Sequence, residues 1–285
     1  MRVAYRFFWP GFDSNNNIFT SVLRLGYENI EVVAVHAEPD LIIQSVFGLK
    51  SEHLGVINAV TYIGEPIAAQ KNWGTTLGFD INREHEGHFY LPLYLLQFSW
   101  LDSQKCYGNP SYRIPIHSLY RSRAVSFTHL RDIFFSCVFN HDPSNNRFSL
   151  LRRLVDRGMH TRAYGKPFGN GGFPDKKKLE IYGNSTYVMA FESREMEGYQ
   201  TEKLVHAYFA GAVPVTWGWT NPNVNQEAIV NANSFETNDN LIDFLIANSA
   251  DEISYRKIYN QPLFEKNPTL DSVAIPILSA VRTTI

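Results

Sequence analysis

The sequence predicts an α/β protein of two domains, on the evidence of its alternating pattern, its length and its composition. Short apolar runs alternate with helical patterns along the chain, and Pro, Gly and Asn clusters separate them. The chain has 285 residues, and a typical domain of about 150 residues makes two domains the expected number. Hydrophobic residues make up 44% and charged residues 19%, which is typical of a folded protein rather than a disordered one.

The first part of the chain has the pattern of a parallel sheet. Four runs of four to six residues are rich in Val and Ile, as buried parallel strands are; they are 3–8, 30–35, 41–46 and 60–63. Residues 18–25 have a helical pattern between the first two runs. Strand and helix in this order predict βαβ units.

The pattern weakens between about 106 and 131, where Gly, Pro, Arg, Ser and His are scattered. We take this region as the crossing between domains at 1–118 and 119–285. A second alternation follows, with expected strands at 134–140, 187–191 and 212–217. The expected helices are 144–157, 201–210, 241–248, 253–259 and 270–284.

Composition and charge exclude several classes of function. The chain carries 26 basic and 28 acidic side chains, a net charge of −2, so we expect no nucleic-acid partner. Two cysteines, Cys106 and Cys137, are too few for a disulfide framework or a four-cysteine zinc site. No stretch reaches the ~18 apolar residues that span a bilayer, and the first residues lack the pattern of a signal peptide. We therefore expect a cytoplasmic protein without stable membrane insertion.

Three neighbouring segments carry the most chemical information. They are YVMAFES at 187–193, YQTEKL at 199–204 and GAVPV at 211–215. Thr201 is a candidate N-cap, and Glu202 suits the positive end of the helix that follows. Lys203 is unfavourable there unless an anion such as a diphosphate binds at the same place. A solvated Glu-Lys pair on a surface helix is the alternative interpretation.

These segments resemble the signature of the α-1,3/4-fucosyltransferases, glycosyltransferase family 10, and the bacterial branch is the most similar. The resemblance continues in the first half with YIGEP at 62–66, LGFD at 77–80 and LPLY at 91–94. Arg147 stands where the family has an arginine that opens a helix. The matching motifs occur in the family's order across about residues 60–265.

The resemblance implies a GT-B fold, in which two Rossmann-like domains face a central cleft. Residues 1–118 are then the acceptor-binding domain and 119–285 the GDP-sugar-binding domain. The implied reaction is inverting transfer of L-fucose from GDP-β-L-fucose to a hydroxyl of an oligosaccharide containing N-acetylglucosamine or glucose. The product linkage is α-1,3 or α-1,4.

The resemblance also assigns roles to residues. Glu65 is the expected general base, although it could instead be a carboxylate that caps the turn before Pro66. Glu202 is expected to contact the fucose or to stabilise positive charge on it. Lys203 and Arg147 are expected to bind the diphosphate. For Arg147 the alternative is an ordinary arginine on a helix surface.

The expected donor site is completed by Tyr199, Glu192, Ser193 and Thr201. Tyr199 could instead pack beneath a loop. The family usually has Asn at the position of Ser193, and a serine side chain cannot make an amide contact there.

No metal or other cofactor is expected. The chain contains no Asp-x-Asp triplet, which other transferases use to hold a metal on the diphosphate. Two alternatives to the fucosyltransferase hypothesis stay open. One is a GT-B transferase that uses another GDP-sugar or an unusual acceptor, and the other is a catalytically silent protein that binds sugar nucleotides or glycans.

Overall fold

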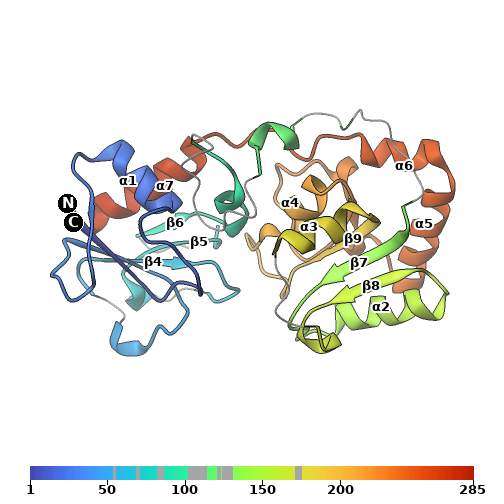
Figure 1. The fold of residues 1–285 in the computed structure, drawn as a ribbon, viewed down its shortest axis with the longest axis horizontal. Coiled ribbons are helices and arrows are strands. Elements are labelled where there is room, and N and C mark those ends of the chain that lie inside the picture. The colour runs from blue at the N-terminus through green and yellow to red at the C-terminus, as the bar shows by residue number, and fades with distance from the viewer. Residues whose placement is uncertain are drawn as a thin grey trace. The chain divides into compact units, whose positions relative to one another are not determined.

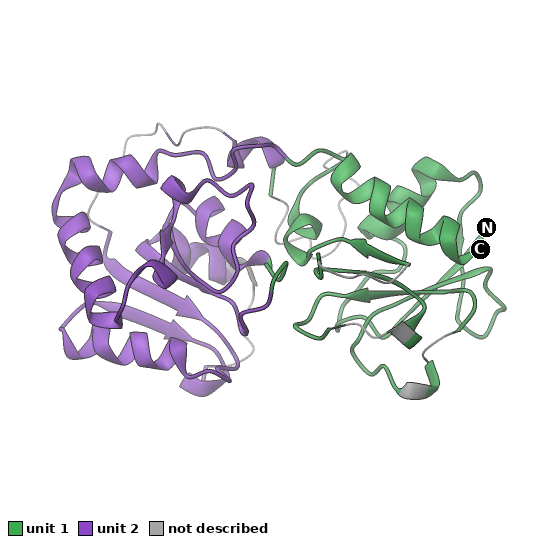
Figure 2. Cartoon of the chain, turned by 180° about the vertical axis from the view of Figure 1, so that it is seen from behind, with its two compact units in different colours: residues 1–115, 197–201, 268–285 green, residues 116–196, 202–267 purple. Residues whose placement is uncertain are grey.

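The computed structural model describes residues 1–53, 56–68, 71–81, 87–101, 114–120, 123, 131–170 and 175–285. The chain divides into two compact units, shown in Figure 2. Unit 1 comprises residues 1–115, 197–201 and 268–285, and unit 2 comprises residues 116–196 and 202–267. Each unit contains a parallel sheet with helices packed against it, which confirms the predicted α/β class.

Unit 1 contains a sheet with the spatial order β2-β1-β3-β4-β5-β6, and every strand pair in it is parallel. Its strands are β1 (Arg2–Arg6), β2 (Glu31–Val32), β3 (Leu41–Gln44), β4 (Ala59–Ile63), β5 (Thr75–Gly78) and β6 (His88–Tyr90). Its α-helices are α1 (Ile18–Gly26) and α7 (Asp271–Thr284). Its short 3-10 helices are Ser51–His53, Lys71–Trp73 and Leu93–Gln97.

Helix α7 packs against β4, β5, β6 and α1, although it comes almost two hundred residues after β6 (Figure 1). Its fully buried side chains are Val273, Ile277, Ala280 and Val281. These positions follow the spacing of one helix face, so α7 covers the sheet with an apolar stripe. The predicted division at 118/119 therefore differs from the units in three segments, 116–118, 197–201 and 268–285.

Unit 2 contains a parallel sheet with the spatial order β11-β10-β9-β7-β8. Its strands are β7 (Ile133–Val138), β8 (Thr161–Tyr164), β9 (Ser185–Phe191), β10 (Val213–Trp217) and β11 (Val230–Asn231). Its α-helices are α2 (Asn146–Asp156), α3 (Asp175–Gly183), α4 (Glu202–Phe209), α5 (Asn238–Ala250) and α6 (Glu252–Tyr259). Its 3-10 helices are Ile116–Leu119, Lys166–Phe168, Gln226–Ala228 and Ala232–Ser234.

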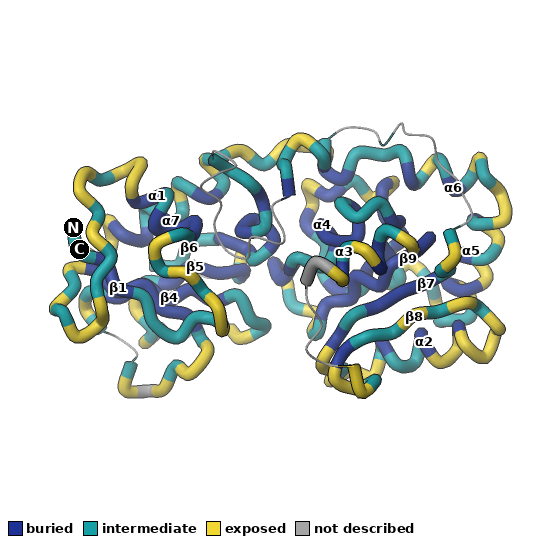
Figure 3. Tube along the Cα trace, in the orientation of Figure 1, coloured by how far each residue is buried: buried dark blue, intermediate teal, exposed yellow. Residues whose placement is uncertain are grey.

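Strand β9 is buried along its whole length because helices cover both faces of its sheet (Figure 3). Tyr187, Met189 and Phe191 point into a cluster that includes side chains of α2, α5 and α6. Val188 and Ala190 point into a second cluster with α3 and α4. This alternation explains why the strand has no polar position in its centre.

No helix among the described residues is long and apolar enough to cross a membrane.

Candidate functional site

A cluster of charged residues in unit 2 lies where β9 ends and α4 begins. Glu192 directly follows the last residue of β9, and Glu202 is the first residue of α4. Because the sheet is parallel, the carboxyl ends of its strands share one edge, where open α/β sheets bind ligands. The predicted start of the helix after Thr201 is confirmed, so Glu202 and Lys203 occupy its first turn.

Lys203 forms an ion pair with Glu192 in this cluster. Its Nζ atom donates to Oε2 of Glu192 at 3.0 Å. The Glu192 side chain is 4% exposed and that of Lys203 is 20% exposed, so water screens the pair weakly. An anion does lie beside Lys203, as expected for a cation at a helix N-terminus, but in this structure it is the Glu192 carboxylate of the protein itself. Ser193, the next residue of the expected site, is half-buried.

Glu202 forms a second ion pair, with Lys178 of α3. The Nζ atom of Lys178 lies 3.6 Å from Oε1 of Glu202 and 3.3 Å from Nδ1 of His206. Lys178 is 9% exposed and His206 is fully buried. Since an ammonium group can only donate, the neutral imidazole accepts through Nδ1 and carries its own proton on Nε2.

This cluster shifts the pKa values of its members. Burial alone raises the pKa of the Glu202 carboxyl, but the positive charges of Lys203 and Lys178 outweigh it. The pKa of Glu202 therefore lies well below its ordinary value. Burial lowers the pKa of His206, and the charge of Lys178 lowers it further. At neutral pH the cluster holds an ionised Glu202 beside a neutral His206.

Arg147 lies in the first turn of α2 and is buried, with 4% of its surface exposed. Its Nη2 atom donates to the carbonyl oxygen of Phe191 at 2.7 Å, and its Nη1 atom donates to the carbonyl oxygen of His141. The alternative of a surface arginine is therefore wrong. The guanidinium joins the carboxyl end of β9 to the loop before α2, and a role in binding a diphosphate stays a prediction.

Tyr199 and Thr201 belong to the short segment 197–201 that clusters with unit 1. Tyr199 is 3% exposed, and its ring packs edge-on against Phe79 with 4.9 Å between the ring centres. At Gly198, where φ is +81°, a Cβ atom would lie 1.8 Å from the carbonyl oxygen of Phe79. The segment therefore packs closely against the residue that follows β5.

Glu65 follows β4 at the carboxyl edge of the sheet in unit 1. Its side chain is half-buried, and its carbonyl oxygen accepts a hydrogen bond from the amide of Ile67 at 2.6 Å. Glu65 comes shortly after a strand, as the sequence predicted, and its backbone bends there. Whether it acts as a base or caps the turn stays a prediction.

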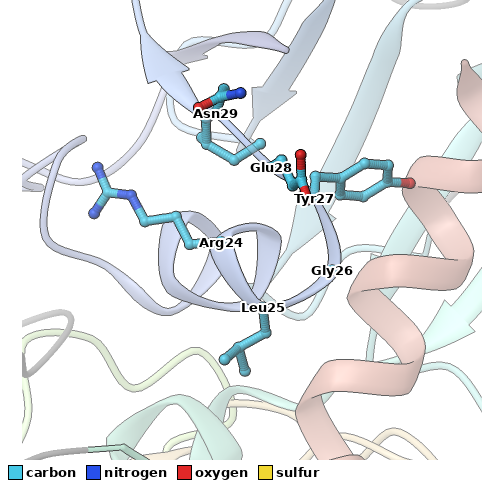
Figure 4. Close-up of a pocket in the computed structure, with 7 residues that line it drawn as sticks. Arg24, Leu25, Gly26, Tyr27, Glu28 and Asn29 are labelled. Carbon is cyan, nitrogen blue, oxygen red and sulfur yellow. The ribbon is translucent and has the colours of Figure 1, made fainter.

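Other features of the described residues do not form a second site of this kind. A shallow pocket in unit 1 is lined by residues 24–30, at the amino end of β2. Its Arg24 and Tyr27 side chains point away from each other (Figure 4). No group of three or more His, Cys, Asp or Glu side chains that could hold a metal is found in the parts of the chain that the structure describes.

Sequence reasoning missed two members of the cluster, Lys178 and His206. Lys178 lies in the run KKK at 176–178, and such a run normally indicates a solvated surface. His206 stands four residues after Glu202, so the two share one face of a helix. That spacing is a signal that could have indicated His206, whereas no pattern in the sequence distinguishes Lys178 from its lysine neighbours.

Two family models match the chain. The model described as the C-terminal domain of glycosyltransferase family 10 (fucosyltransferase) matches residues 130–262. The model described as the N-terminal domain of alpha-(1,3)-fucosyltransferase FucT matches residues 3–97. The two matches occur in order and together cover most of the sequence.

Similar proteins also include whole relatives and solved structures. An alpha-(1,3)-fucosyltransferase of Helicobacter pylori is 23% identical over 264 residues, which cover 83% of this chain and 55% of the relative. The bovine (Bos taurus) 4-galactosyl-N-acetylglucosaminide 3-alpha-L-fucosyltransferase 9 is 31% identical over 98 residues, which cover 34% of this chain and 26% of the relative. This chain thus spans about half the length of the first relative and less of the second.

Crystal structures of an alpha1,3-fucosyltransferase share the fold. The structure without a named ligand has a TM-score of 0.72 at 21% identity and covers 99% of this chain and 90% of its own. The structure with GDP-fucose has a TM-score of 0.70 at 19% identity. The match covers 98% of this chain and 90% of the chain in that structure. At this identity the likeness establishes the fold, which is the predicted GT-B class.

Proposed function

Because the chain belongs to glycosyltransferase family 10, we propose that it transfers L-fucose from GDP-β-L-fucose to a hydroxyl group of an oligosaccharide. The acceptor contains N-acetylglucosamine or glucose, and the new linkage is α-1,3 or α-1,4. The observation that carries this proposal is the largely buried charged cluster of Glu192, Glu202 and Lys203 at the carboxyl edge of the sheet in unit 2. It falls within the segment that the glycosyltransferase model matches.

The reaction is a single displacement with inversion. Glu65 takes the proton of the acceptor hydroxyl as its oxygen forms a bond to the anomeric carbon of fucose. The bond from that carbon to the diphosphate oxygen breaks, and GDP leaves with the electron pair. The β-linked donor thereby becomes an α-linked product.

The departing diphosphate needs compensating positive charge, which we assign to Lys203 and Arg147. The Lys203 ammonium forms an ion pair with Glu192. When the donor binds, the same ammonium must therefore contact both the Glu192 carboxylate and a phosphate group of GDP-fucose. Glu202 is kept ionised by Lys178 and Lys203, which suits a carboxylate that accepts hydrogen bonds from fucose hydroxyls. Ser193, Tyr199 and Thr201 complete the proposed donor site, and the reaction proceeds without a metal ion.

The first test is release of GDP by the purified chain from GDP-fucose, GDP-mannose and GDP-arabinose. Each donor is assayed with and without N-acetyllactosamine or lacto-N-biose, and with and without EDTA. The proposal expects release from GDP-fucose alone, stimulated by an acceptor and unchanged by EDTA. Stimulated release from another donor would support the alternative transferase, and donor binding without turnover on an acceptor panel would support the silent binder.

The second test is Glu65→Gln, which keeps the shape of the side chain but cannot accept a proton. We expect kcat to fall by a factor of about 10² or more while GDP affinity stays unchanged, since general-base catalysis is worth roughly 10²–10⁴. Glu28→Gln is the matched control, because Glu28 is an exposed carboxylate of the same unit at the amino end of β2. Wild-type turnover by Glu65→Gln would exclude Glu65 as the base.

A further inference from the structure

The loop after β1 carries an aromatic cluster that the roles assigned so far do not use. The rings of Phe8 and Phe12 stack with centres 4.0 Å apart and planes 17° apart. Trp9 packs edge-on against both, at 5.4 Å from Phe8 and 5.3 Å from Phe12. We call residues 8–12 the aromatic loop. All three rings remain partly exposed, whereas core aromatics of unit 1 such as Phe19 and Tyr62 are fully buried.

The aromatic loop is held in one conformation at its start. Phe7 has a φ of +62°, a left-handed conformation that costs a residue with a bulky side chain about 1–3 kcal/mol. Its carbonyl oxygen accepts a hydrogen bond from the amide of Phe47 at 3.0 Å, and the amide of Phe12 closes the turn on the carbonyl oxygen of Trp9 at 3.2 Å. Residues held in an unfavourable backbone conformation by surrounding hydrogen bonds are common at functional sites.

The residues after the loop are fixed by side-chain hydrogen bonds. Asn17 caps α1 by accepting from the amide of Thr20, and its Nδ2 atom donates to the carbonyl oxygens of Asp13 and Ser14 at 2.9 Å each. The Thr20 hydroxyl also contacts the hydroxyl of Tyr5, whose ring packs on both Phe8 and Phe12. The aromatic loop is therefore anchored on both sides.

A row of ring contacts leads from the aromatic loop to Tyr62 of β4, three residues before Glu65. Phe8 packs on Phe19 at 5.7 Å, and Phe19 packs on Tyr62 at 5.3 Å. A side chain at Gly64, the residue before Glu65, would begin 3.1 Å from the Tyr62 ring. The aromatic loop follows β1 and Glu65 follows β4, so both lie at the carboxyl edge of this parallel sheet.

We propose that the aromatic loop is an acceptor subsite, where a pyranose ring of the oligosaccharide stacks on the Trp9 ring and contacts Phe12, whose ring stands at 86° to it. The face of an aromatic ring is electron-rich, and the C–H groups on one face of a sugar ring carry partial positive charge. Two partly exposed rings held in fixed positions give such a sugar a surface that loses little entropy on binding. This inference rests on the proposed function, because it takes the acceptor as the ligand.

The test measures acceptor KM, donor KM and kcat for Trp9→Ala, Trp9→Phe and Phe12→Leu. We expect Trp9→Ala to raise the acceptor KM about tenfold and to leave the GDP-fucose KM and kcat at saturating acceptor nearly unchanged. Phe12→Leu should act in the same direction, and Trp9→Phe should restore most of the affinity. Tyr27→Leu, an aromatic of the same unit at the amino end of β2, is the control and should change none of these values.

A direct binding measurement separates this proposal from the proposed function. Titration of N-acetyllactosamine is followed by tryptophan fluorescence and by calorimetry, without donor. If the wild type transfers fucose but Trp9→Ala keeps its acceptor KM and glycan affinity, the subsite is excluded and the function stands. If the wild type transfers nothing yet binds the glycan through Trp9, the function fails and the subsite stands. Sedimentation of the wild type, but not of Trp9→Ala, with phosphatidylcholine vesicles would assign the loop to a membrane surface and overturn the proposal.

Discussion

Replacing Lys178 with Met should destabilise unit 2 at neutral pH. The substitution keeps an unbranched chain of similar length and removes the ammonium that lies 3.6 Å from Glu202 and 3.3 Å from His206. Glu202 then keeps Lys203 as its cationic neighbour. The Glu202 side chain is only 23% exposed, so water compensates only part of the loss of its second cation.

The expected size of the effect follows from the distance. Two unit charges 3.6 Å apart attract by about 4–5 kcal/mol at an effective dielectric constant of about 20. Removing the ammonium also removes the cost of burying it, and Lys203 still compensates part of the carboxylate charge. We therefore expect a net loss of about 2–3 kcal/mol in the free energy of unfolding, which lowers Tm by roughly 5–10 °C.

The assay is urea denaturation at pH 7.5, followed by circular dichroism. Lys177→Met is the matched control, because Lys177 neighbours Lys178 on the same helix and is exposed; its change should stay within about 0.5 kcal/mol. Equal stability of the two variants would refute the assignment of Lys178 to the buried ion pair. A double-mutant cycle with His206→Leu measures how far the ammonium and the imidazole are coupled.

The same cluster gives a dependence of stability on pH. His206 stays neutral in the folded protein, but in the unfolded chain it binds a proton below about pH 6.5. Stability therefore falls as the pH drops below this value, because the unfolded state binds more protons. The depressed pKa of Glu202 adds stability that is present above about pH 4.3 and is lost below it. In Lys178→Met the pKa of His206 should rise, because the Glu202 carboxylate remains beside it and the ammonium is gone. The stability lost between pH 7 and pH 5 should therefore be smaller in this variant than in the wild type.

Two further predictions concern the packing of unit 2. Gly165→Ala should cost about 3 kcal/mol or more, because its φ is +126° and a Cβ would lie 1.8 Å from the Phe139 carbonyl oxygen. Gly158→Ala is the control, because Gly158 also has a positive φ, +73°, but a Cβ atom there would meet no other atom; it should cost only about 1 kcal/mol. Both free energies of unfolding are measured by urea denaturation, and equal losses in the two variants would refute the steric argument. Burial raises the pKa of the Cys137 thiol to about 12, so iodoacetamide at pH 8 should leave it unmodified in the folded protein. Peptide mapping after labelling with and without urea checks this, and labelling of the native protein would contradict the burial.

The strands that the sequence predicts well are those with continuous apolar runs. Strand β9 carries seven buried residues and was expected at 187–191, and β4 was expected at 60–63. Strand β5, with the sequence TTLG, and the three-residue β6 were not predicted, because too few of their residues are strongly apolar for a pattern to emerge. Helix α3 was missed because its three lysines conceal a face on which Ile181 and Tyr182 are buried.

For the candidate site, the sequence indicated the residues but not their partners. Family motifs pointed to Glu192 and Lys203, yet no spacing rule predicts that these two side chains form an ion pair across a loop. Arg147 was expected at the start of a helix, and the structure adds that it bonds to backbone carbonyl groups. Such contacts depend on how the strands and helices pack, which local sequence patterns do not encode.

The return of α7 to unit 1 has a consequence for synthesis on the ribosome. Strands β4, β5 and β6 emerge early, but the helix that covers them emerges only after every strand of unit 2 has been made. Unit 2 needs only the chain up to residue 267, so it can close while unit 1 still exposes an apolar sheet face. The usual order, in which the N-terminal domain folds first, is then reversed. During that interval the uncovered sheet face of unit 1 is the apolar surface through which the nascent chain can aggregate.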